Sequence, residues 1–155
     1  MNAASVVRGS CLCGSVRFSA ELPTKWVAHC HCTFCRRAHG APFVTWAGFA
    51  SSAFALEPGS LQPGWYESSP GARRAHCPRC GTPMLFESAR WPGEVHVARA
   101  LIEAPLDKEP GAHVFYETHV PWLQVQDALP KKVSPAVASP PPSGATPSHS
   151  ASGDA

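Results

Sequence analysis

Apolar residues occur in short alternating segments along the chain, a pattern typical of β-strands with one buried face. In residues 14–20, Val16 and Phe18 lie two positions apart and therefore face the same side of a strand. Comparable segments between turn-forming residues span 26–29, 43–46, 54–56, 65–66, 73–76, 84–86, 94–101 and 113–116. The pattern predicts a mainly β domain of short strands, with residues 94–101 as the longest strand.

The 17 prolines exclude long helices through most of the chain, because proline removes a helix hydrogen bond and clashes with the preceding turn. One short helix is expected over residues 33–39. The Thr33 hydroxyl can cap its first turn, and Gly40 can end it in the left-handed conformation. No internal repeat is present in the sequence.

The composition changes towards the C-terminus. Residues 133–155 are mostly Ser, Pro, Ala and Gly, with two valines and no aromatic residue, and cannot bury enough apolar surface to offset their ordering entropy. We predict one folded domain over residues 5–130 and a disordered tail over residues 131–155. Residues 1–10 lack the apolar region of a secretory signal, and no apolar run approaches the ~20 residues of a membrane helix. These features favour a cytoplasmic protein without a membrane span.

The seven cysteines form three tight groups: Cys11 and Cys13; Cys30, Cys32 and Cys35; and Cys77 and Cys80. An odd number excludes complete intramolecular disulfide pairing. A Cys-x-x-Cys turn can direct two sulfurs at one ion about 2.3 Å away. Buried thiols without a metal would not explain the clustering, and a thioredoxin-like redox role lacks the βαβ context. The grouping therefore predicts zinc–thiolate sites in a reducing compartment.

Seven thiolates can form one closed site with four ligands and one open site with three. Spacing alone does not decide the division, because the two Cys-x-x-Cys pairs could share one ion. However, 41 residues separate Cys35 from Cys77, more than an ordinary zinc-ribbon spacer. We therefore prefer a structural zinc held by the outer pairs and a second, open zinc held by the central triplet; the ligands are Cys11, Cys13, Cys77 and Cys80, and Cys30, Cys32 and Cys35.

Three polar residues beside the triplet are candidates for substrate binding. His31 can point away from the metal or lie over its open position; as a fourth ligand it would make both sites structural. Arg36 and Arg37 are either solvated surface charges or donors to the thiolates and to a substrate carboxylate. We retain His31, Arg36 and Arg37 as candidate substrate-binding residues.

The net charge argues against a nucleic-acid partner. The formal charge is +2 with neutral cysteines, and seven thiolates holding two Zn²⁺ ions would bring it to −1. The chain therefore has no basic excess with which to bind a nucleic acid.

Three motifs resemble those of the glutathione-dependent formaldehyde-activating (GFA) family, which includes the centromere protein V group. They are GSCLCGSVRF over residues 9–18, CHCTFCRRAHG over 30–40 and CPRCGTP over 77–83. Weaker agreement continues through residues 101–105, His113, Pro121-Trp122 and residues 127–130, so the resemblance covers about residues 8–130.

The resemblance implies an Mss4-like fold of short antiparallel sheets around zinc, with the preferred division of the cysteines. It also implies formation of S-(hydroxymethyl)glutathione, a carbon–sulfur lyase reaction in which a thiol adds to formaldehyde at the three-cysteine zinc. The expected partners are a small thiol and a small aldehyde. The alternative is a non-catalytic zinc module that binds a protein or nucleic acid. The oligomeric state is left open.

Overall fold

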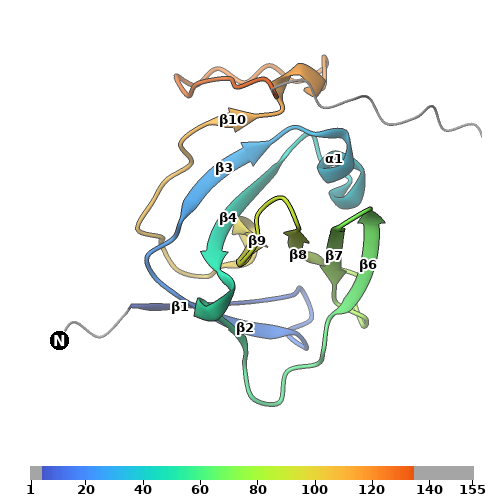
Figure 1. Cartoon of the computed structure of the whole chain (residues 1–155), viewed down its shortest axis with the longest axis vertical. Helices are drawn as coiled ribbons and strands as arrows, with labels where there is room; N and C mark the ends of the chain where they lie inside the picture. Colours follow the sequence, from blue (N-terminus) through green and yellow to red (C-terminus); the bar gives the residue numbers. More distant parts are fainter. Residues whose placement is uncertain (1–4, 135–155) are drawn as a thin grey trace, which may run out of the picture.

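The computed structural model describes residues 5–134 of the 155-residue chain, which form two β-sheets and one short α-helix (Figure 1). The predicted mainly β class is confirmed. From residue 135 onward the predicted tail lies outside the described residues. Its first four residues, 131–134, do make backbone hydrogen bonds: the Lys132 N–H donates to the His113 carbonyl at 2.7 Å, and the Ser134 N–H donates to the Glu117 carboxylate.

The smaller sheet has three antiparallel strands in the order β1-β2-β5. Their bounds are β1 (Val6–Ser10), β2 (Arg17–Glu21) and β5 (Phe54–Leu56). Strand β1 was not predicted, because one of its two buried positions is Gly9, which carries no apolar signal. A Cβ at Gly9 would overlap the Leu101 carbonyl oxygen and the Phe18 ring, so the close packing at this position requires glycine.

The larger sheet has seven strands in the order β10-β3-β4-β9-β8-β7-β6. Their bounds are β3 (Trp26–Cys30), β4 (Val44–Ala50), β6 (Gly64–Ser69), β7 (Ala72–His76), β8 (Pro83–Ser88), β9 (Glu94–Ala98) and β10 (His113–Val114). All neighbours pair antiparallel except β10 and β3, which are parallel. A long connection from β9 brings β10 to the edge of β3 (Figure 1).

The longest predicted strand is shorter than expected. Strand β9 ends at Ala98, a 3₁₀ turn follows, and β4 with seven residues is the longest strand. The apolar pattern continues past Ala98 because Ile102 is buried against the small sheet, where it forms a bridge with Gly9. The three 3₁₀ turns in the described residues are η1 (Ser51–Ala53), η2 (Arg99–Leu101) and η3 (Tyr116–Thr118).

The helix α1 spans Thr33–His39, as predicted. Gly40 ends it in the left-handed conformation, with φ 58°. The expected cap was wrong: Cys32 is the N-cap, and its Sγ accepts a hydrogen bond from the Cys35 N–H at 3.3 Å. A cysteine therefore takes the position that the sequence assigned to Thr33, which couples the start of the helix to the cysteine triplet.

The main core joins the two sheets. It includes Phe18 from the small sheet and Phe49, Met84 and Val97 from the large sheet, all fully buried. Phe18 also stacks on Phe54, with ring centroids 5.5 Å apart. A second, smaller cluster contains Cys30, Cys35, Val44, Trp46 and Ala98. The central cysteines thus lie in an apolar environment, separate from the main core.

We expect Phe18→Ala to reduce the free energy of unfolding by about 3–5 kcal/mol, because it leaves a cavity where the sheets meet. Tyr66→Ala, at a mostly exposed aromatic position, should change it by about 0.5 kcal/mol or less. Urea unfolding of the zinc-loaded proteins, followed by circular dichroism, measures both values. Equal effects would contradict the central position of Phe18.

Candidate metal centres

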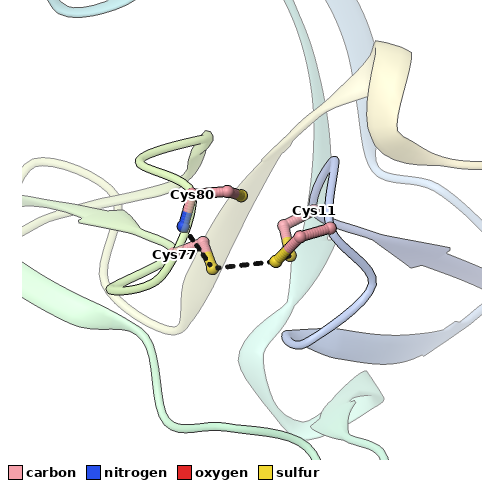
Figure 2. A group of neighbouring side chains, drawn as sticks. Cys11, Cys77 and Cys80 are labelled. Carbon is pink, nitrogen blue, oxygen red and sulfur yellow. Dashed lines mark hydrogen bonds between the residues drawn. The ribbon is translucent and has the colours of Figure 1, made fainter.

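Cys11, Cys13, Cys77 and Cys80 form a four-sulfur group between two facing turns (Figure 2). One turn connects β1 to β2 and the other connects β7 to β8. The four sulfurs lie within 4.8 Å of one another; the separations are 3.6 Å for Cys11–Cys13 and 3.9 Å for Cys13–Cys77. Sulfurs that bind one zinc tetrahedrally at about 2.3 Å lie roughly 3.8 Å apart. The group therefore has the spacing of a closed metal site.

The two turns differ by one residue in length but share one feature. In each, a glycine with positive φ follows the second cysteine: Gly14 at 72° and Gly81 at 76°. The Gly14 N–H donates to the Cys11 carbonyl at 3.0 Å, and the Gly81 N–H donates to the Cys77 carbonyl at 2.9 Å. Only glycine adopts this conformation readily. The glycines therefore allow the tight turns that direct both sulfurs of each pair towards the other turn.

Thr82 joins the two turns and contacts a sulfur. Its Oγ1 accepts a hydrogen bond from the Leu12 N–H at 3.1 Å and lies 3.1 Å from the Cys80 sulfur. The Thr82 hydroxyl lowers the pKa of Cys80 to about 5. Because metals bind the thiolate rather than the thiol, this contact prepares Cys80 for coordination.

Cys30, Cys32 and Cys35 form a three-sulfur group, whose sulfurs also lie within 4.8 Å of one another. Cys30 ends β3, Cys32 caps α1 and Cys35 lies in its first turn. Cys30 and Cys35 are buried, whereas Cys32 is partly exposed. Among the described residues, no histidine or carboxylate belongs to this group. A metal held here would have three protein ligands and an open position.

Cys35 is the most strongly stabilised thiolate of the three. Hydrogen bonds from the Cys30 and Cys32 thiols, and then the charge of Arg74, lower its pKa far below the usual range. Both terminal nitrogens of the Arg74 guanidinium lie 3.7 Å from the Cys35 sulfur, and the Trp46 indole N–H donates to that sulfur at 3.4 Å. The guanidinium also lies over the Phe86 ring.

Sequence reasoning missed Arg74 and considered only Arg36 and Arg37 as partners of the thiolates. Within residues 5–134, Arg74 is the one arginine that hydrogen-bonds a cysteine sulfur. A usable signal was present, because Arg73 and Arg74 are adjacent in a predicted strand. Neighbouring strand residues point to opposite faces, so one of the two must turn towards the protein interior, where a buried arginine requires an anionic partner.

His31 lies away from the three-sulfur group. Its Nε2 is 2.8 Å from Nδ1 of His113, whose Nε2 contacts the Asp127 carboxylate at 2.9 Å. Burial, followed by the nearby His113, lowers the pKa of His31 to about 4. His31 is therefore neutral at pH 7 and belongs to a separate group with His29, His113 and Asp127, which we call the histidine cluster.

Arg36 and Arg37 line a surface pocket of about 340 Å³ together with Thr33, Gly40, Ala41, Val120 and Trp122. None of the seven cysteines lines it, although α1 contributes both the arginines and Cys35. A larger hollow of about 520 Å³ lies over β6–β9 and has no cysteine in its lining. The smaller pocket is therefore the better candidate for a substrate, because α1 connects it to the three-sulfur group.

Comparison with known proteins relates this arrangement to one family. Residues 6–118 match the model of the glutathione-dependent formaldehyde-activating enzyme family. The chain belongs to this family. The match includes all seven cysteines and ends before Asp127, so the last member of the histidine cluster lies outside it.

Three known proteins are similar to this chain, and the name of the first states the same family. A Halomonas elongata protein named "Putative glutathione-dependent formaldehyde-activating enzyme" is 28% identical over 131 residues, which cover 78% of this chain and 82% of that protein. A Schizosaccharomyces pombe protein named as an uncharacterised lyase is 31% identical over 78 residues, covering 50% and 55% of the two chains. The crystal structure of a Rhodobacter sphaeroides protein matches with a TM-score of 0.54 and 26% identity, over 64% of this chain and 91% of that one. In the described residues, no helix is long and apolar enough to cross a membrane.

We expect Cys77→Ser and Cys32→Ser to have different effects. Loss of Cys77 should abolish metal binding by the four-sulfur group and destabilise the fold, because that metal would join turns far apart in the sequence. Loss of Cys32 should remove only the metal of the triplet, whose ligands lie within six residues. Thermal unfolding together with zinc content per chain separates the two outcomes, and equal destabilisation would contradict this division.

We expect Arg74→Met to weaken zinc retention by the three-sulfur group about tenfold, a loss typical of removing a hydrogen-bond partner of a metal ligand. The matched control is Arg73→Met, because the neighbouring Arg73 pairs with Glu87 at the surface instead. Zinc transfer to a competing metal-binding dye measures retention. If the two variants release zinc equally fast, Arg74 does not stabilise the thiolate.

Proposed function

We propose that the protein is a zinc-dependent carbon–sulfur lyase that activates glutathione, or a similar thiol, for addition to formaldehyde or another small aldehyde. The observation that carries this proposal is the three-sulfur group, which offers three ligands and leaves one position open beside a partly exposed Cys32. Family membership supports the choice of thiol and aldehyde, and one relative is named as a lyase.

In this proposal each chain carries two zinc ions with different roles. The four-sulfur group would hold a structural zinc, because four thiolates leave no coordination position for a substrate. The three-sulfur group would hold the catalytic zinc through Cys30, Cys32 and Cys35. Both sulfur groups fit a zinc ion, because their sulfurs have suitable spacings and soft thiolate ligands suit zinc. Such thiolates persist in the cytoplasm, where we place the protein.

A zinc held by Cys30, Cys32 and Cys35 would supply a Lewis acid that lowers the pKa of a substrate thiol, which in free solution is about 8.5. The thiolate sulfur then forms a bond to the aldehyde carbon, and the carbonyl oxygen takes up the proton that the thiol released. Holding the aldehyde beside that sulfur makes the addition a local event instead of a two-body encounter. The product is a hemithioacetal, S-(hydroxymethyl)glutathione when the pair is glutathione and formaldehyde.

Arg74 has a positioning and electrostatic role in this scheme. Three thiolates around Zn²⁺ carry a net charge of −1, which would oppose the approach of a fourth thiolate. The Arg74 guanidinium contacts the Cys35 sulfur through two nitrogens and offsets this charge in an apolar environment, where electrostatic interactions are strong. The open position at the three-sulfur group can therefore accept an anionic sulfur.

We propose that Arg36 and Arg37 bind the carboxylates of the thiol substrate. Both line the 340 Å³ pocket, and guanidinium groups bind carboxylates through two parallel hydrogen bonds. The Nη2 of Arg36 donates to the Thr33 hydroxyl at 3.4 Å, which orients the guanidinium beside the pocket. Val120 and Trp122 would provide the apolar side of the pocket. His31, held by His113, would act at most by supporting the adjacent cysteines.

The test is the rate at which zinc-loaded protein interconverts glutathione and its formaldehyde adduct, measured by exchange NMR. We expect acceleration above the uncatalysed reaction for the wild type and none for Cys32→Ser. Arg36→Met should raise the glutathione concentration for half-maximal rate roughly tenfold, the effect of losing one charge-assisted hydrogen bond. It should leave the reaction of the uncharged 2-mercaptoethanol unchanged.

A non-catalytic zinc module would give another result. The alternative would be favoured if the protein did not accelerate the reaction of any thiol and also bound DNA or a protein with an affinity that falls steeply with salt. A zinc spectrum that glutathione perturbs, without formaldehyde turnover, would keep the open thiol site and reject formaldehyde as the substrate.

A further inference from the structure

The histidine cluster lies outside both sulfur groups and has the composition of a metal site. Strands β3 and β10 lie side by side (Figure 1), and His29 and His113 are partners in the parallel ladder between them. Their ring centroids are 4.8 Å apart. One ligand atom from each ring and one Asp127 oxygen lie within 4.8 Å of one another. Two imidazoles and a carboxylate thus converge on one point at the edge of the large sheet.

Hydrogen bonds orient both rings. Nδ1 of His29 is 2.8 Å from the Thr45 hydroxyl oxygen, and Thr45 is the partner of His29 in the β3–β4 ladder. Nδ1 of His113 is 2.8 Å from Nε2 of His31. Metal-binding histidines commonly donate their second ring N–H to such a neighbour, which fixes the tautomer. The His29 ring has no second hydrogen-bond partner among the described residues. The His113 Nε2–H donates to the Asp127 carboxylate at 2.9 Å, and an ion between them would take the place of that proton.

His31 shows that this polar network is incomplete among protein atoms. If the His113 Nδ1–H donates to His31 Nε2, the His31 proton must lie on Nδ1, which is buried and has no partner among the described residues. The only hydrogen bond of the His29 ring in the described part of the chain is the one to Thr45. The His31 Nδ1 is not among the converging ligand atoms, whereas the His29 ring lies beside His113 and Asp127 without a second partner of its own.

The simpler explanation is that His113 and Asp127 form an ordinary hydrogen-bonded pair that holds the C-terminal segment. That pair explains the contacts at 2.9 and 3.1 Å, but it does not explain why a second imidazole lies beside them, tilted by 30° to the His113 ring. Ligands about 2.1 Å from a tetrahedral zinc lie roughly 3.4 Å apart. The His113–Asp127 contacts would therefore lengthen by only a few tenths of an ångström to admit an ion.

We propose that His29, His113 and Asp127 bind a third divalent transition-metal ion, of which Zn²⁺ is the simplest example. Imidazole and carboxylate ligands suit this class of ion, and two histidines with one acid leave a position for water. His113 is fully buried, whereas the Asp127 side chain is 38% exposed. The ion therefore has a rigid ligand on the protein side and an entry path from solvent through Asp127.

Such an ion would fasten the segment after η3 to the large sheet. Val120 and Trp122, which line the pocket with Arg36 and Arg37, lie between η3 and Asp127 in the sequence. His29 directly precedes Cys30 of the three-sulfur group. The third ion would thus hold one wall of the pocket in place, although its binding does not depend on the proposed lyase reaction.

The experiment is a count of zinc ions per full-length chain by native mass spectrometry, after equilibration with excess Zn²⁺ and removal of the free metal. We expect three zinc ions in the wild type and two in Asp127→Asn and in His29→Gln. The matched control is His119→Gln: His119 lies near the cluster, is exposed and is not one of the proposed ligands. This control should retain three.

A second measurement distinguishes the loss of a metal ligand from misfolding of the variant. Adding Zn²⁺ to protein that already carries two zinc ions should raise the melting temperature of the wild type and of His119→Gln, but not of Asp127→Asn. Two zinc ions at saturation in the wild type, or three in folded Asp127→Asn, would overturn the proposal. Either result would leave the two sulfur groups, and the proposed lyase function, untouched.

Discussion

The fold depends on the convergence of the Cys11–Cys13 turn and the Cys77–Cys80 turn. These turns belong to different sheets, and 63 residues lie between Cys13 and Cys77. Their sulfurs approach to 3.9 Å, while Phe18 and its neighbours fill the space where the sheets meet. A metal at this point would couple two chain segments whose own hydrogen bonds are local. This coupling would add to the apolar core, in which Phe18 of the small sheet is fully buried against the large sheet.

Strand β3 serves two sites because its side chains alternate between faces. Cys30 faces the small apolar cluster with Trp46, and Arg74 reaches this cluster from β7. His29 faces the other side of the sheet, together with His113, its partner in the β3–β10 ladder. The thiolates are therefore accompanied by a guanidinium and an indole N–H, whereas the imidazoles are accompanied by a carboxylate. Each side has ligands suited to a different kind of metal site.

Much of the site could be predicted from the sequence, since its signals are local. Tight cysteine spacing, a glycine after Cys13 and another after Cys80, and helix residues ending at Gly40 all act within a few residues. Alternating apolar residues indicated the mainly β class for the same reason. The errors of prediction were also local. Strand β1 was missed because Gly9 gives no apolar signal, and the apolar residues beyond Ala98 predicted a strand longer than β9.

Which residues accompany each cysteine group was decided only by tertiary structure. Nothing in the sequence near residue 35 indicates Arg74, and His31, between two cysteines, turns instead to His113, 82 residues later. The order of the strands, the parallel pairing of β10 with β3 and the face to which each side chain points determine these partners, and all three depend on long-range packing. Amino-acid spacing determined the cysteine turns; the pairing of distant strands determined the charges and hydrogen bonds around them.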